Sequence, residues 1–229
     1  MKELVSVIVP CLNEVKKLPE NLSRLLAADT VAEIIVVDGG STDGTLKAVE
    51  ALMISTKDPR LSLYQCSPGR AVQMNYGAAR ANAQWLLFHH ADSFIDRVAV
   101  DAIVQGRGEW GGFLHSFTPS NWKLRIVSWL HNFRWRQTGI VYGDQSMFVR
   151  RSFFKALGGF KEGTIEDLEF SDRAVEAAAS IMLPYYVQTD SRKFIQMGEF
   201  RALWQVCVIL WRYERNRKVG KDEFFKPYR

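Results

Sequence analysis

The sequence has few cysteines, no internal repeat and no long hydrophobic run. Its three cysteines, Cys11, Cys66 and Cys207, are far apart and form no C-x-x-C pair, so we expect no disulfide framework and a reducing compartment. The N-terminal apolar run lacks the features of a signal peptide. The longest late apolar run, 202–211, is shorter than the roughly 20 residues needed to cross a bilayer. These absences predict a cytoplasmic protein.

Acidic residues are missing from part of the chain. The net charge is +5, yet residues 121–136 carry four Lys/Arg and no acid, and residues 212–229 carry seven Lys/Arg against three acids. These stretches, which contain or adjoin Trp and Tyr, predict a face for an anionic membrane surface, a site for an acidic ligand, or a solvated basic face, and all three interpretations stay open. No nucleic-acid recognition motif accompanies them, so we expect no nucleic-acid partner.

Apolar segments recur regularly in the first half of the chain. Short segments that are apolar on both faces alternate with helical patterns there. Such segments are typical of a parallel sheet with helices on both faces. The predicted strands are 5–9, 33–37, 61–66 and 85–89, and the predicted helices are 19–28, 45–54 and 70–83.

The second half has a less regular pattern. No linker separates it from the first half, so we predict a single α/β domain over residues 1–229. The expected strands are 110–118, 146–149 and 181–189, and the expected helices are 94–104, 122–135, 167–178 and 200–213, with a short helix ending before Gly158.

Polar residues follow every predicted strand of the first half. They occupy positions 13–14, 38–43, 69–70 and 90–92. In a parallel sheet the ligand lies beyond the carboxyl ends of the strands, so we expect these clusters to share one cleft. The dinucleotide fingerprint Gly-x-Gly-x-x-Gly does not follow the first strand, which argues against a Rossmann dinucleotide site.

Two of these clusters contain candidate binding residues. Asp38 can accept hydrogen bonds from a ribose hydroxyl or a base N–H, but its segment also reads as a turn with Ser41 and Asp43 as helix caps. Asp92 can hold a divalent metal beside a diphosphate, with His90 as a second ligand or a hydrogen-bond donor. Asp92 can equally cap the following helix, and the sequence does not decide between these roles.

Three later or neighbouring segments add further candidates. Glu166 and Asp167 open a predicted helix, where an acid can accept a proton or simply stabilise the helix dipole. Arg70 opens another helix, where its guanidinium and the helix N-terminus can face a phosphate, or it is surface charge. Residues 143–145 precede a strand and can orient a hydroxyl or form a plain turn.

Taken together, these segments resemble the family-2 glycosyltransferases of the GT-A fold. The resemblance rests on Val-Ser-Val-Ile-Val-Pro-x-Leu-Asn-Glu near the N-terminus and Val-Val-Asp-Gly-Gly-Ser-Thr-Asp-Gly-Thr after it, and it covers roughly residues 4–195 as an ordered set. Residues 68–78, 88–93, 142–145, 158–160 and 166–169 extend it. It is strongest to a compact subgroup, some of whose members are labelled arsenosugar-biosynthesis glycosyltransferases, and we take no substrate from that label.

The resemblance implies a Rossmann-like, mostly parallel sheet with a small antiparallel addition. Residues 1–105 would bind a nucleoside-diphosphate sugar, usually of uridine, residues 106–195 the acceptor, and residues 196–229 would form a basic amphipathic helix and tail. Asp167, beside Glu166, would be the base of an inverting transfer to a small-molecule or lipid-linked hydroxyl. The donor site would comprise Pro10, Asn13, Glu14, Asp38, Gly40, Arg70, Asn75, His90, Ala91, Asp92, Gly143, Asp144 and Gln145.

The chain departs from the family pattern at its metal motif. Asp92 matches the last Asp of Asp-x-Asp and is the predicted ligand of Mg²⁺ or Mn²⁺, but His90 replaces the first Asp. The segment Ser191-Arg192-Lys193 stands where some members have a final metal-binding histidine. Cationic side chains are therefore expected to share with the metal the task of countering the charge of the diphosphate. A non-catalytic nucleotide-sugar-binding or partner subunit is therefore the alternative. A nucleotidyltransferase is disfavoured because Arg, Lys and a Gly-rich loop are missing after the first strand.

Overall fold

The computed structural model describes residues 3–163, 165–192 and 195. The predicted helix 200–213, and the whole tail 196–229, lie outside the described residues. The strands are β1 (Val5–Cys11), β2 (Val31–Asp38), β3 (Leu61–Gln65), β4 (Trp85–Phe88), β5 (Ser93–Ile95), β6 (Trp110–Thr118), β7 (Phe148–Arg150) and β8 (Ile181–Asp190). The helices are α1 (Leu18–Leu26), α2 (Thr45–Thr56), α3 (Arg70–Arg80), α4 (Arg97–Ala102), α5 (Trp122–Thr138), α6 (Arg151–Ala156) and α7 (Glu166–Ala177), with short 3₁₀ turns η1 (Ile103–Gln105) and η2 (Gly143–Gln145).

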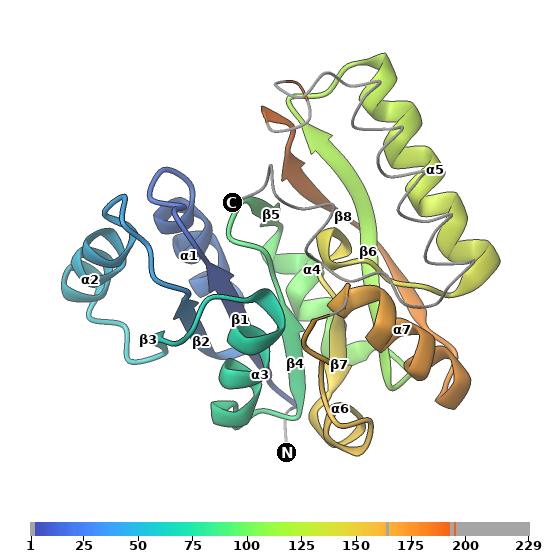
Figure 1. Cartoon of the computed structure of the whole chain (residues 1–229), viewed down its shortest axis with the longest axis horizontal. Helices are drawn as coiled ribbons and strands as arrows, with labels where there is room; N and C mark the ends of the chain where they lie inside the picture. Colours follow the sequence, from blue (N-terminus) through green and yellow to red (C-terminus); the bar gives the residue numbers. More distant parts are fainter. Residues whose placement is uncertain (1–2, 164, 193–194, 196–229) are drawn as a thin grey trace.

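The strands form one mixed sheet in the order β3-β2-β1-β4-β7-β6-β8-β5 (Figure 1). The strands β3, β2, β1 and β4 pair in parallel with their neighbours in this group, which confirms the predicted parallel half. β7 is antiparallel to both β4 and β6, β5 is antiparallel to β8, and β6 and β8 are parallel. Cys11 pairs with Asp38, so the carboxyl ends of β1 and β2 lie side by side. The polar segments that follow them therefore begin at the same edge.

Helices cover both faces of the sheet because successive strand residues point to opposite sides. Val5, Val7 and Val9 of β1 belong to a core that includes buried residues of α1, α2 and α4. Ile8 of the same strand belongs to a second core with α3, α6 and α7. The near-continuous apolar β1 is what a strand buried on both faces requires.

The segment 94–104 is not one helix, and the prediction was wrong there. Residues Ser93–Ile95 instead form β5, which pairs with the distant β8. The helix α4 starts only after Asp96, whose side chain accepts a hydrogen bond of 2.9 Å from the Val98 N–H. Asp92 is therefore not the N-cap of this helix, because the cap falls four residues later.

The suggested cap at Ser41 is also absent. Gly44, with φ of +95°, is the N-cap of α2. Asp43 does act as a capping side chain, because its Oδ1 accepts a hydrogen bond of 3.0 Å from the N–H of Thr45, the first residue of α2. The Ser41 hydroxyl is engaged elsewhere, with Asp38 and with the Asn13 N–H.

The helix α5 lies along the outer side of β6 (Figure 1). Leu124 and Ser128 are its buried residues. None of the helices in the described part of the chain combines the length and the apolar character needed to span a membrane.

Candidate active site

A pocket lies where β4, α3, η2 and α7 approach one another. Its polar wall is made by Arg70, His90, Glu166 and Asp167, together with Gly143. Its apolar wall is made by Met74, Phe88, Met147 and Phe160. All five residues of the polar group were predicted site residues, and they come from four separate parts of the chain.

Asp167 is held in place by two backbone N–H groups. The Gly143 N–H donates to its Oδ2 at 2.7 Å, and the Leu168 N–H donates to its Oδ1 at 2.9 Å. Burial and the neighbouring Glu166 carboxylate raise the pKa of Asp167, although the Gly143 N–H and Arg70 oppose the shift. A carboxylate with a raised pKa is a better proton acceptor than an ordinary aspartate, so Asp167 suits general base chemistry.

Arg70 supplies positive charge at the same pocket. Its Nη1 lies 3.4 Å from Oε1 of Glu166, whose side chain is only 2% exposed, while Arg70 itself is 48% exposed. Desolvation lowers the pKa of Arg70, but the negative charges of Glu166, Asp167, Asp92 and Asp144 raise it more. An exposed guanidinium at the start of α3 can donate hydrogen bonds to the oxygens of a phosphate group.

His90 and Asp167 converge on Gly143. A Cβ added at Gly143 would lie 2.8 Å from His90 Nε2 and 3.2 Å from Asp167 Oδ2, so only glycine fits between them. Burial and the Arg70 guanidinium lower the pKa of His90 to about 4. The His90 imidazole is therefore neutral at pH 7 and has a lone pair available to a metal or a hydrogen-bond donor.

Asp92 does not line the pocket, but its charge reaches it. The negative charge of its carboxylate raises the pKa of Arg70. It also acts on Arg192, whose pKa is raised first by its Asp190 hydrogen bond and further by Glu14 and Asp92. The charge of Asp92 therefore acts on cations from two separate elements. Lys193, the second cation of the segment expected to assist the metal, lies outside the described residues.

Asp38 is turned into its own loop. It is fully buried, and its Oδ2 accepts hydrogen bonds of 2.8 Å from both the Gly40 and the Ser41 N–H groups. Its Oδ1 accepts from the Ser41 hydroxyl and from the Cys11 thiol, whose pKa is raised by burial and by Asp38. The contacts in this structure thus fix the loop, and a contact of Asp38 to a ligand stays a prediction.

Other predicted donor-site residues also cross-link loops. Asn13, with φ of +58°, accepts a hydrogen bond of 2.9 Å from the Thr42 N–H. Asn75 exchanges two hydrogen bonds with the backbone of Phe160, at 2.8 and 3.0 Å. Gln145 is fully buried and accepts from the Tyr142 N–H at 3.0 Å. The remaining ones are Pro10 and Ala91, both buried, and Glu14 and Gly40, which lie in the loops after β1 and β2.

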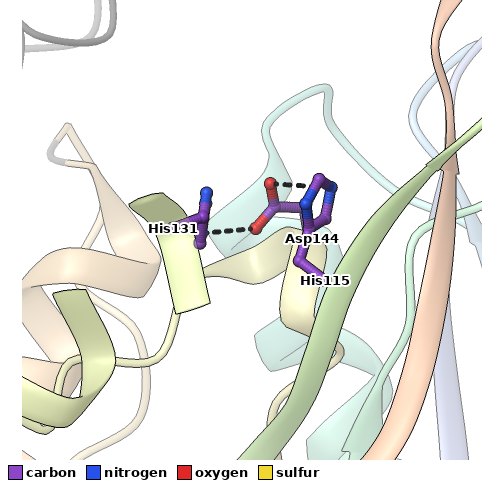
Figure 2. A group of neighbouring side chains, drawn as sticks. All are labelled: His115, His131 and Asp144. Atoms are coloured by element: carbon purple, nitrogen blue, oxygen red, sulfur yellow. Dashed lines mark ion pairs between the residues drawn. The ribbon is translucent and has the colours of Figure 1, made fainter. Parts of the chain in front are cut away.

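Two histidines that no sequence pattern indicated lie next to this pocket. His115 from β6 and His131 from α5 both face Asp144, at 3.6 and 3.2 Å (Figure 2). Burial raises the pKa of Asp144, but His131 and His115 lower it overall, so Asp144 is ionised. Neither histidine belongs to a recognisable motif, and only their rarity, four in the whole chain, could have drawn attention to them.

The mostly parallel mixed sheet with helices on both faces is a GT-A-like fold. The profile of the family described as "Glycosyl transferase family 2" matches residues 6–158, and the chain belongs to this family. The matched range ends before Glu166 and Asp167. The family is therefore shown by the first two thirds of the chain, and the recognised resemblance is confirmed.

The curated relatives of this chain include two bacterial proteins. The chain is 26% identical over 201 residues to "Succinoglycan biosynthesis protein ExoA" of Rhizobium meliloti, covering 77% of this chain and 59% of ExoA. It is 26% identical over 194 residues to "PGL/p-HBAD biosynthesis glycosyltransferase Rv2957" of Mycobacterium tuberculosis, covering 78% of this chain and 72% of that protein.

Solved structures with the same fold bind sugar nucleotides. A mannosyltransferase from Pyrobaculum calidifontis, in complex with GDP-Man and Mn²⁺, has a TM-score of 0.67 at 23% identity, covering 81% of this chain and 57% of that one. The Staphylococcus aureus protein TarS, residues 1–349 with UDP-GlcNAc, has a TM-score of 0.64 at 21% identity, covering 82% and 59%. The chain thus spans about three fifths of ExoA and of these two chains. At such identities the likeness establishes the fold.

Proposed function

We propose that this chain transfers a sugar from a nucleoside-diphosphate sugar, with UDP as the nucleotide, to a hydroxyl acceptor with inversion at the anomeric carbon. The observation that carries the proposal is Asp167: a carboxylate with a raised pKa, fixed by two N–H donors, on the polar wall of the pocket. Inverting transfer needs a base of this kind, because the acceptor hydroxyl must lose its proton as it attacks.

The chemical step uses residues on both sides of the pocket. The acceptor oxygen forms the new bond to the anomeric carbon while the bond to the diphosphate oxygen breaks, and the acceptor proton passes to Asp167. An α-linked donor then gives a β-linked product. Arg70 and the N-terminus of α3 face the negative charge of the departing diphosphate.

We propose that a divalent ion, Mg²⁺ or Mn²⁺, binds beside these residues. Asp92 offers a carboxylate oxygen and the neutral His90 a ring nitrogen, and such ions commonly add substrate phosphate oxygens and waters to one or two carboxylates. When bound, the ion supplies charge neutralisation at the diphosphate. The Mn²⁺ in the mannosyltransferase complex supports this assignment by fold. The two neighbours carry different nucleotides and sugars, so they do not select one sugar.

The decisive experiment replaces Asp167 by Asn in the full chain. We expect transfer to fall by about 10²–10⁴-fold, the range typical of a lost general base, with donor binding retained. Glu176→Gln, an exposed acid at the far end of α7, is the matched control and should leave the rate unchanged. Undiminished turnover in Asp167→Asn would remove Asp167 from the base role.

The alternative is a non-catalytic nucleotide-sugar-binding or partner subunit. It is favoured by His90 at a position where the family has a carboxylate. Calorimetry with UDP, with and without Mn²⁺, followed by a donor hydrolysis assay on the wild-type protein, separates the two. Binding without hydrolysis or transfer would favour the alternative.

A second proposal concerns α5. Its exposed side carries Trp122, Ile126, Trp129, Leu130 and Phe133, with exposures of 66, 46, 60, 42 and 43%. Lys123, Arg125, Arg134 and Arg136 lie on the same helix, which has no acid. Aromatic and apolar residues flanked by cations suit an anionic bilayer surface. We propose that α5 makes a peripheral membrane contact at the cytoplasmic leaflet, which would favour a lipid-linked acceptor.

A further inference from the structure

Three potential metal ligands from three separate elements meet beside the pocket. They are His115 of β6, His131 of α5 and Asp144 of η2, and one ligand atom from each lies within 4.8 Å of the other two. Figure 2 shows the Asp144 carboxylate between the imidazoles, with one oxygen facing each ring. The residues are far apart in the sequence, so the fold alone assembles this cluster.

The spacing of the ligand atoms fits a metal ion. His115 Nε2 lies 3.6 Å from Asp144 Oδ2, and His131 Nε2 lies 3.2 Å from Asp144 Oδ1. Charge-assisted hydrogen bonds are shorter, at about 2.7–2.9 Å. In a tetrahedral zinc site with bonds of about 2.0–2.2 Å, neighbouring ligand atoms are about 3.3–3.6 Å apart. The 3.6 Å separation at His115 is longer than a hydrogen bond, and the 3.2 Å separation at His131 is at the long end of the range. Both are close to the edge length of such a tetrahedron.

His115 gives an independent reason to expect a ligand. Its side chain is fully buried, and neither ring nitrogen has a hydrogen-bond partner among the described residues. A buried polar group without a partner destabilises the fold, so native structures rarely leave one. An ion bound at Nε2 would satisfy this group.

The frame around the cluster is fixed before any ion binds. Asn132, next to His131, holds the backbone of His115: the His115 N–H donates to its Oδ1 at 2.8 Å, and its Nδ2 donates to the His115 carbonyl at 3.0 Å. This pair ties α5 to β6 at the level of the two histidines. Ligands on cross-linked elements lose little freedom on binding, which favours affinity.

We propose that His115, His131 and Asp144 form a binding site for a transition-metal ion, with Zn²⁺ as the best match. Two imidazole nitrogens and one carboxylate oxygen suit zinc and leave a fourth position for water. The site is distinct from the ion proposed at Asp92. Asp144 follows Gly143, whose N–H holds Asp167, so the ion would stiffen this wall of the pocket. The site does not depend on Asp167 being the base.

The test measures metal binding in the absence of any nucleotide. The full chain, freed of metal by a chelator, is titrated with Zn²⁺ by calorimetry and with Co²⁺, whose visible spectrum reports tetrahedral coordination. We expect one equivalent to bind and to raise the thermal midpoint. His131→Ala and His131→Gln should each weaken binding by at least about 100-fold, since even loss of an outer partner costs 10–100-fold. Asp92→Asn should leave it unchanged.

His131 is the best position to change because its side chain is partly exposed, at 16%, so its variants should fold. Circular dichroism of each variant checks this. The proposal is overturned if the wild-type chain binds no stoichiometric Zn²⁺ or Co²⁺, or if both His131 variants bind as tightly as the wild type. It is also overturned if Asp92→Asn abolishes binding, because the ion would then occupy the donor site.

Discussion

The Gly143 N–H donates a hydrogen bond of 2.7 Å to Oδ2 of Asp167, and this bond joins η2 to the first turn of α7. The same glycine leaves room for the His90 ring, which a side chain at position 143 would meet at 2.8 Å. One backbone position therefore sets the distance between the proposed base and the histidine of the metal motif.

Replacing Gly143 by Ala should separate these groups. The added methyl must displace His90 or Asp167, and a misplacement of about 1 Å can lower a rate by about 10²-fold. We expect a loss in kcat of that order with the fold retained, measured by steady-state kinetics and circular dichroism. Gly108→Ala is the control, because the nearest atom to its added methyl is a methyl carbon of Ile181 at 3.3 Å, away from the pocket. Equal activity of the two variants would contradict the prediction.

Replacing Glu166 by Gln should shift the pH profile. Asp167 must be ionised to accept a proton, so its raised pKa places the acidic fall in kcat/KM at higher pH than an ordinary aspartate would. Removing the Glu166 charge lowers the pKa of Asp167, and the fall should move to lower pH. The control variant Glu176→Gln should keep the wild-type pH profile. If the acidic fall of kcat/KM in Glu166→Gln stays at the same pH or moves to higher pH, a group other than Asp167 controls it.

Acid should destabilise the protein through His89. Its Nε2 donates to the Ser93 carbonyl at 2.8 Å, its Nδ1 accepts from the Ser146 hydroxyl at 2.7 Å, and burial lowers its pKa to about 4. The folded state therefore binds fewer protons than the unfolded one, so the free energy of unfolding should fall as the pH drops from about 6.5 to about 4. Urea unfolding at several pH values measures this slope. His89→Gln, though less stable at pH 7, should show a shallower slope, and an identical slope would contradict the account.

Replacing Asp38 by Asn should destabilise the loop after β2. Both oxygens of the carboxylate accept hydrogen bonds, one from the Gly40 and Ser41 N–H groups and the other from the Cys11 thiol and Ser41 hydroxyl. An amide keeps only one accepting oxygen, so its NH₂ group would meet donors on one side, and a buried unsatisfied group costs about 1–3 kcal/mol. The free energy of unfolding, measured with urea, and the affinity for UDP should therefore both fall. Ser41→Ala, which removes only the hydroxyl, is the milder control. A loss of affinity with unchanged stability would instead mean that Asp38 acts mainly on the ligand.

Paired substitution of Trp122 and Trp129 by Ser should abolish membrane binding if α5 is the contact. Both side chains are mostly exposed, so the fold should tolerate the change. We expect the wild type, but not the variant, to float with vesicles containing anionic lipid. Exposed Ile54 on α2 offers the control, as Ile54→Ser should float like the wild type. A wild type that remains wholly in the soluble fraction would remove the proposal.

Local sequence determined much of the architecture. β1, β2 and β4 are almost wholly apolar, and this pattern by itself placed a parallel sheet between two layers of helices. It also placed polar residues at the ends of these strands. Of the five predicted residues that line the pocket, His90 follows β4 and Arg70 follows β3, as this rule expects. Gly143, Glu166 and Asp167 reach the same pocket from η2 and α7 in the second half of the chain.

Long-range pairing decided the rest. β5 replaced the start of a predicted helix because β8, about ninety residues later, supplies its hydrogen bonds. Asp38 turned inward because the N–H groups of its own loop satisfy it. His115, His131 and Asp144 meet only when β6, α5 and η2 are packed together, and no spacing in the sequence encodes that meeting. Hydrophobic periodicity is a local property, whereas contacts between side chains on distant elements depend on register and packing, which only the tertiary structure specifies.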